Sequence, residues 1–187
     1  MKKTKTNPTN TNSQITFAQP AGHDNLILIG MPTCGKSTVG IILAKALGYD
    51  FIDGDLVIQR NTGKKLSQLM EERGVDGFLQ LEEETLCGIS CSHSVIAPGG
   101  SAVYGEKAMA HLKELGRVIY LKMDLDMLEE RLHDAKNRGV ALREGQTIEM
   151  LFNERVPMYE RYADITVDER GHALEDMVVL IVSQLAG

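Results

Sequence analysis

Short apolar runs alternate along this chain with longer segments whose apolar residues recur at helical spacing. This alternation favours an α/β fold built on a parallel sheet. The expected strands cover residues 26–29, 50–52, 94–97, 117–121 and 164–167. The expected helices cover residues 36–47, 55–61, 66–73, 77–90, 105–115, 125–134, 147–162 and 172–185.

Two stretches depart from the alternation. Residues 1–24 are rich in Thr, Asn, Lys and Gln and nearly free of large apolar side chains, so we expect a disordered tail. Residues 135–146 are polar and contain two glycines together with Arg138 and Arg143, which predicts a mobile loop. The chain has 187 residues, the length of one domain, which we place at residues 25–187.

The most specific local motif is a phosphate-binding loop. Residues 30–37 are Gly-Met-Pro-Thr-Cys-Gly-Lys-Ser, which matches G-x-x-x-x-G-K-[ST] at every fixed position. A strand pattern precedes the loop and a helical pattern follows it, as the motif requires. Gly30 and Gly35 allow successive N–H groups to turn toward phosphate oxygens. Lys36 can reach the β- and γ-phosphates, and the Ser37 hydroxyl can ligate Mg²⁺.

Two carboxylates follow the second expected strand, where an α/β sheet presents functional groups. Asp53 can hold Mg²⁺ directly or through water, and Asp55 can accept a proton from a substrate hydroxyl. Helix capping is the structural alternative, because both residues precede a helical pattern. The phosphate loop upstream favours the functional interpretation.

Two later segments carry further candidates. Gly99 and Gly100 follow the third expected strand, where glycines form a plain turn or let backbone N–H groups approach a substrate. Arg155 lies in a helical pattern interrupted by Pro157. Such an arginine is usually solvated, but a bend at the proline would turn it inward.

Composition narrows the function classes. A net charge of −6 and the lack of a basic stripe with interleaved aromatics argue against a nucleic-acid partner. No apolar run approaches transmembrane length and the tail has no apolar segment, so we expect a cytoplasmic protein without a membrane partner. Cys34, Cys87 and Cys91 are expected to be reduced thiols. The spacing of Cys87, Cys91 and His93 matches no common zinc pattern.

Taken in order, these segments resemble the shikimate kinase family. The resemblance runs from about Asn25 to the C-terminus. Its pieces are the phosphate loop with Thr38, Phe51-Ile-Asp-Gly-Asp55, Arg60-Asn-Thr-Gly63, Gly74-Val-Asp-Gly-Phe78 with Glu82, Ala97-Pro-Gly-Gly100, and Glu154-Arg-Val-Pro-Met-Tyr159 followed by Ala163-Asp164. It implies a three-layer α/β/α P-loop kinase fold with a five-stranded parallel sheet and a mobile lid at about residues 135–146. It also implies that ATP, with Mg²⁺, phosphorylates shikimate to shikimate 3-phosphate. We expect the protein to be a monomer or a weak dimer.

The resemblance assigns roles to individual residues. Those implied for catalysis are Lys36, Asp55 and Arg138, the last as a lid arginine that reaches the phosphates. Those implied for nucleotide binding are Gly30, Pro32, Thr33, Cys34, Gly35, Lys36, Ser37, Thr38 and Arg131, the last beside adenine. Ser37 and Asp53 would organise Mg²⁺. Asp55, Gly99, Gly100 and Arg155 would bind the acceptor, with Arg155 on its carboxylate.

Two departures concern the acceptor. The family's Gly-Phe-Arg segment is Gly77-Phe78-Leu79 here, so one of two carboxylate-binding arginines is absent and Glu82 loses its companion. The third glycine of the family's Gly-Gly-Gly turn is Ser101. These changes leave open a different small hydroxylated acceptor.

A non-catalytic nucleotide-binding module is a further alternative, although such a module has little need for Asp55. A GTP-dependent switch is disfavoured, because no Asn-Lys-x-Asp segment follows any expected strand.

Overall fold

The computed structural model describes residues 25–133 and 140–186. Five parallel strands form one sheet in the order β2-β3-β1-β4-β5. The strands are β1 (Asn25–Ile29), β2 (Asp50–Asp53), β3 (Ser94–Ala97), β4 (Gly116–Lys122) and β5 (Ile165–Asp168). The helices are α1 (Lys36–Leu47), α2 (Gly54–Thr62), α3 (Leu66–Cys87), α4 (Glu106–Leu115), α5 (Leu125–His133), α6 (Ile148–Tyr162) and α7 (Leu174–Leu185), with a 3₁₀ turn η1 (Ala102–Tyr104).

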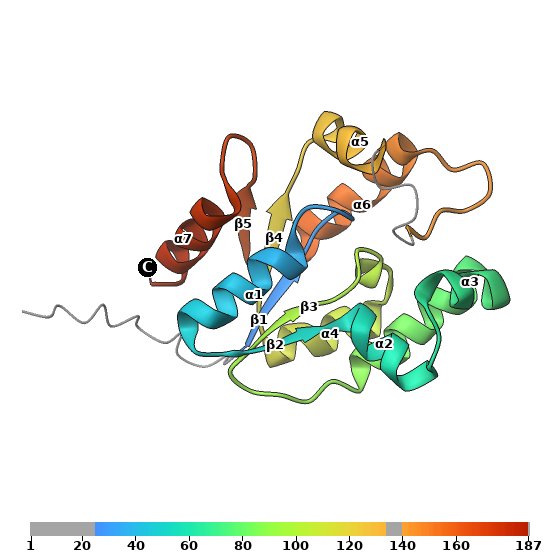
Figure 1. The fold of residues 1–187 in the computed structure, drawn as a ribbon, viewed down its shortest axis with the longest axis horizontal. Coiled ribbons are helices and arrows are strands. Elements are labelled where there is room, and N and C mark those ends of the chain that lie inside the picture. Colours follow the sequence, from blue (N-terminus) through green and yellow to red (C-terminus); the bar gives the residue numbers. More distant parts are fainter. Residues whose placement is uncertain (1–24, 134–139, 187) are drawn as a thin grey trace, which may run out of the picture.

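The helices lie on both faces of the sheet, which gives three layers (Figure 1). Helices α1 and α7 pack against each other on one face, while α4 and α6 contact β4 from the other. Strand β1 is buried along its whole length, as expected for a central strand covered on both sides. The α/β/α architecture with five parallel strands is therefore confirmed.

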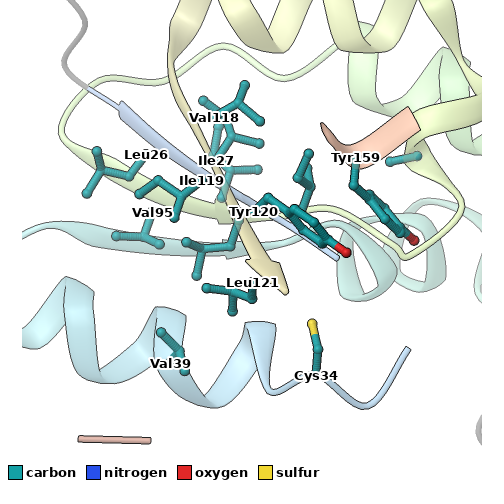
Figure 2. Close-up of a cluster of buried hydrophobic side chains, with 14 of the residues drawn as sticks. Leu26, Ile27, Cys34, Val39, Val95, Val118, Ile119, Tyr120, Leu121 and Tyr159 are labelled. Carbon is teal, nitrogen blue, oxygen red and sulfur yellow. The ribbon is translucent and has the colours of Figure 1, made fainter. Parts of the chain in front are cut away.

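The core fills the space between the sheet and these helices. Leu26, Ile27, Val118 and Ile119 from the central strands are fully buried (Figure 2). The rings of Tyr120 in β4 and Tyr159 in α6 stack with their centroids 5.2 Å apart. This stacking fixes α6 against the sheet and so fixes the residues that α6 contributes to the site.

The expected elements agree with the structure to within a few residues, with one difference. Segments 66–73 and 77–90 were expected as separate helices, and α3 is indeed interrupted between them at Gly74, whose φ of 69° and ψ of 176° are not helical and favour glycine. Helix α6 continues through Pro157, where the sequence predicted a bend or restart. The missing N–H leaves the carbonyl of exposed Asn153 to water, which keeps the cost low.

The predicted tail, residues 1–24, lies outside the described residues, as does part of the predicted lid. In the part of the chain that is described, no helix is long and apolar enough to cross a bilayer.

Candidate active site

A cavity of about 540 Å³ opens at the carboxyl ends of the five strands. The segments that follow these strands all contribute to its wall, because parallel strands present their carboxyl ends at one edge of a sheet. The predicted site residues on this wall are Pro32, Thr33, Gly35, Lys36, Ser37, Thr38, Asp53, Asp55, Gly99, Gly100, Arg131 and Arg155. The structure thus brings together residues from five separate segments of the chain.

The phosphate loop connects β1 to α1. The Lys36 Nζ donates to the carbonyl oxygens of Gly30 at 3.0 Å and Met31 at 2.8 Å, so the ammonium group lies across its own loop. A side chain at Gly30 would meet the carbonyl oxygen of Leu121 at 2.7 Å, and its φ is 149°. Only glycine fits this position, which lets the loop pass close over the end of β4.

Gly30 and Cys34 belong to the loop but are not among the residues that line the cavity. Figure 2 shows the Cys34 side chain pointing from the loop toward the sheet, where it is fully buried. Burial raises the pKa of the Cys34 thiol, although Lys36 opposes this. Since the thiolate is the reactive form, the geometry supports a packing role for Cys34 over a redox role.

Asp53 links β2 to both the loop and the next helix. Its Oδ2 accepts a hydrogen bond from the Ser37 hydroxyl at 2.8 Å, and its Oδ1 accepts one from the Leu56 N–H at 3.1 Å. The two interpretations of Asp53, as a helix cap and as a functional carboxylate, are therefore compatible. The cap stabilises α2, and it orients a carboxylate beside the Ser37 hydroxyl.

Asp55 follows one helical residue later and lines the same cavity. Burial raises the pKa of its carboxyl group, Asp53 raises it further, and Lys36 lowers it. The Asp55 Oδ1 lies 3.1 Å from the point that a Gly99 Cβ would occupy. A side chain at Gly99 would therefore press against the carboxylate that we expect to receive the substrate proton.

Glu82 of α3 lies behind the same glycine. Its Oε1 would be 2.1 Å from a Gly99 Cβ, and the residue is only 2% exposed. Burial raises the pKa of Glu82 to about 7, while a hydrogen bond from the Ser101 side chain lowers it. The Oε1 atom has no hydrogen-bond partner among the residues described. The sequence predicted an unaccompanied negative charge here, and burial shifts this carboxyl group toward its neutral form.

Leu79, where the family has an arginine, is half-buried in a small apolar cluster. It packs against a buried cluster that contains Ile58, Leu69 and Phe78, and it is not among the residues that line the cavity. The apolar packing explains how α3 accommodates the change. The acceptor end of the cavity consequently receives no charge from position 79.

Arg155 of α6 is 1% exposed and lines the cavity, so the sequence-based possibility of a solvated side chain is excluded. Its Nε donates to the Tyr104 hydroxyl at 3.2 Å, and its Nη2 donates to the Ala141 carbonyl at 3.2 Å. Its guanidinium carbon lies 5.0 Å from the centre of the Tyr104 ring. These contacts hold the guanidinium at the wall although α6 is unbroken at Pro157.

The Gly99–Gly100 turn is held from α6 as well. The Tyr159 hydroxyl donates to the Gly100 carbonyl at 2.5 Å, and a side chain at Gly100 would meet the Pro32 ring at 3.2 Å. Both glycines thus allow a close approach, Gly99 to the Glu82 carboxyl group and Gly100 to the Pro32 ring of the phosphate loop. Tyr159 was part of the sequence motif, but its contact with the turn was not predicted.

Arg131 of α5 lies at the opposite end of the cavity, beside the phosphate loop. Its Nη1 donates to the Thr33 carbonyl at 3.0 Å and lies 2.6 Å from the Glu169 Oε1. The sequence analysis missed Glu169. Its position directly after β5 was the available signal, because each other strand of this sheet also carries site residues beyond its carboxyl end. The predicted lid residue Arg138 lies outside the described residues.

The shikimate kinase family model matches residues 32–186. This chain belongs to the shikimate kinase family. It is 34% identical over 163 residues to the shikimate kinase of Thermodesulfovibrio yellowstonii, which covers 86% of this chain and 94% of that protein. It is 36% identical over 166 residues to the shikimate kinase of Thiobacillus denitrificans, covering 87% and 90%. The family membership inferred from the motifs is confirmed, and with it the prediction of a small-molecule kinase.

Solved structures of the family agree with the fold. A shikimate kinase from Acinetobacter baumannii in complex with shikimate gives a TM-score of 0.80 at 31% identity, covering 87% of this chain and 93% of that one. The shikimate kinase of Aquifex aeolicus gives 0.72 at 32% identity, covering 86% and 96%. The shared architecture includes the five-stranded parallel sheet, and the cavity lies at the carboxyl ends of its strands.

Proposed function

We propose that this protein transfers the γ-phosphoryl group of ATP, with Mg²⁺, to a hydroxyl of shikimate and forms shikimate 3-phosphate. One observation carries the proposal. A single cavity joins the phosphate loop, the Asp55 carboxylate and the buried Arg155 guanidinium in a member of the shikimate kinase family. A binding site for the phosphate donor, a proton acceptor and a carboxylate-binding cation are the three features that this reaction needs.

The residues beside the phosphate loop fit Mg²⁺ and nucleotide. Magnesium prefers oxygen ligands, and the Ser37 hydroxyl and Asp53 carboxylate lie 2.8 Å apart on the cavity wall. When bound, Mg²⁺ would neutralise charge on the β- and γ-phosphates. Lys36 would exchange its bonds to the Gly30 and Met31 carbonyls for bonds to the phosphates. Arg138 would add a further cation from the lid.

Asp55 would hold the acceptor hydroxyl and receive its proton. Burial and the neighbouring Asp53 raise its pKa, which makes the carboxylate a stronger base than an exposed aspartate. Gly99 and Gly100 would approach the acceptor through their backbone. Their positions are set by Tyr159 on one side and by Pro32 on the other.

Arg155 would bind the acceptor carboxylate at the far wall of the cavity. A guanidinium has five N–H donors in a planar fork, so Arg155 can bind a carboxylate while it keeps its bonds to Tyr104 and Ala141. Because Leu79 gives no second cation, this one arginine would carry that contact alone. The apolar packing of Leu79 is also what favours the second candidate, the same reaction with another small hydroxylated acid.

The decisive measurement is ADP release with Mg·ATP and shikimate, beside a panel of hydroxylated acids, sugars and amino alcohols. Lys36→Ala serves as the blank, and Lys45→Ala, an exposed lysine of the same helix, serves as the matched control. Shikimate-dependent release abolished only in Lys36→Ala would support the proposal. ADP release with another compound alone would identify that compound, in place of shikimate, as the acceptor. Nucleotide binding without ADP release in the presence of any compound would favour a binding module.

A further inference from the structure

Thr33 in the phosphate loop has an unusual backbone conformation. Its φ is 68°, a region that β-branched residues rarely adopt. The neighbouring contacts must therefore hold it there. Its Oγ1 is buried without a hydrogen-bond partner among the described residues, and the residue lines the cavity beside Lys36 and Ser37.

The contact that holds Thr33 comes from distant parts of the chain. Arg131 Nη1 donates to the Thr33 carbonyl at 3.0 Å, and the same nitrogen lies 2.6 Å from the Glu169 Oε1. Thr33, Arg131 and Glu169 belong to the phosphate loop, to α5 and to the segment after β5. The ion pair of Glu169 with Arg131 therefore crosses the nucleotide end of the cavity and contacts the phosphate loop; we call this ion pair the strut.

Glu169 is built into the wall at its own end. It is 2% exposed, and its N–H donates to the Lys122 carbonyl at 2.9 Å. Burial raises the pKa of its carboxyl group, while the hydrogen bond and the charge of Arg131 lower it. Glu169 lines the cavity, and its Oε2 is buried without a hydrogen-bond partner among the described residues. The arginine stabilises this buried carboxylate. If either partner is removed, the other charge remains in the protein without a counter-charge, which is strongly destabilising.

We propose that Glu169 is a positioning residue for nucleotide binding: it holds Arg131 against the Thr33 carbonyl, and this strut keeps the phosphate loop in its binding conformation. The inference rests on the proposed function, because it takes the loop to be the site for ATP. The fixed backbone would present the loop N–H groups and the Thr33 hydroxyl to the phosphates before the nucleotide arrives.

Mg·ADP affinity, measured by calorimetry without any acceptor, tests the strut directly. Glu169→Gln keeps the shape but removes the charge, and we expect binding weaker by about tenfold. The matched control is Glu160→Gln, which removes an exposed glutamate paired with Lys122 at 3.8 Å and should leave binding unchanged. Wild-type affinity in Glu169→Gln would overturn the proposal.

A double-mutant cycle separates the strut from a direct contact with the nucleotide. Glycine adopts positive φ without strain, so in Thr33→Gly the loop should depend less on the strut. We expect Glu169→Gln to weaken binding by less than about threefold in that background. An equal loss in both backgrounds, or a changed preference between ADP and GDP, would show that Glu169 contacts the nucleotide itself and would overturn the positioning role.

Two further measurements distinguish a loss of nucleotide affinity from a loss of folding or stability. If Glu169→Gln does not fold, Arg131→Gln breaks the same strut from a side chain that is 36% exposed, and the same cycle applies. Thermal melting without nucleotide shows whether a variant has only lost stability, and a lower melting temperature at wild-type affinity counts against the proposal. A wild-type protein that binds no Mg·ADP would instead contradict the proposed function.

Discussion

Burial raises the pKa of the Glu82 carboxyl group, and the neighbouring Ser101 side chain lowers it. These two residues connect the two departures from the family pattern. Leu79 takes away the arginine that would accompany Glu82, and Ser101, in place of a glycine, supplies a hydroxyl to the same carboxyl group. Positions 79 and 101, where the sequence departs from the family pattern, therefore both bear on the Glu82 carboxyl group.

The raised pKa of Glu82 predicts a specific pH dependence of stability. An unfolded glutamate has a pKa of 4.5, against about 7 in the folded protein, so the folded state binds more protons between these values. Its contribution to stability is therefore full below pH 4.5 and is lost as the pH rises through 7. Glu82→Gln, which stays neutral, should be more stable than the wild type at pH 8 by up to about 3 kcal/mol.

The comparison at two pH values isolates this residue. At pH 4 the wild-type carboxyl is mostly protonated in both the folded and the unfolded protein, so the two proteins should have similar free energies of unfolding in urea. Glu84→Gln, an exposed change on the same helix, is the matched control. A Glu82→Gln variant less stable than the wild type at pH 8 would mean that Glu82 is ionised and paired in the folded state.

Leu79→Arg restores a cation beside Glu82. We expect the Michaelis constant for shikimate to fall by roughly tenfold, because a charge-assisted hydrogen bond to a carboxylate contributes about 1.5–3 kcal/mol. The apolar packing with Phe78 and Leu69 will be partly lost, so the melting temperature should fall slightly. Leu79→Met, which keeps the packing, is the control. An unchanged Michaelis constant would show that the acceptor does not reach this side of the cavity.

Tyr159→Phe removes the hydroxyl that holds the Gly100 carbonyl at 2.5 Å. The stacking on Tyr120 is kept, so the fold should survive with a loss of about 1 kcal/mol in the free energy of unfolding. We expect a higher Michaelis constant for the acceptor and an unchanged one for ATP, since Gly100 lies on the acceptor side. Tyr162→Phe in the same helix should change neither, and an equal effect of both variants would argue against a role of the turn.

Asp55→Asn keeps the size of the side chain but removes the base. Steady-state kinetics should show kcat reduced at least about a hundredfold, the usual size of a general-base contribution. Mg·ADP affinity, measured separately by calorimetry, should stay within about twofold of the wild type. Asp126→Asn, an exposed residue of α5, is the control. Full turnover in Asp55→Asn would remove Asp55 from the mechanism.

Several features of this protein follow from the sequence alone. The strands and helices are encoded locally, by apolar runs and by helical spacing, so their positions were predicted to within a few residues. The phosphate loop is a contiguous motif whose glycines, lysine and serine act within eight residues. The positions of Asp53, Asp55 and Arg155 came from the order of the segments and from the family resemblance.

Other features depend on residues that meet only in the folded chain. Arg155 is separated by 51 residues from Tyr104, and Arg131 by 98 residues from Thr33, so no local sequence pattern predicts these hydrogen bonds. The sequence offered a bend at Pro157 as a way to turn Arg155 inward, but Arg155 reaches Tyr104 and Ala141 from an unbroken helix. Protonation is likewise a tertiary property. The pKa of Glu82 is set by burial and by the charges and hydrogen bonds that folding brings around it, which the sequence does not specify locally.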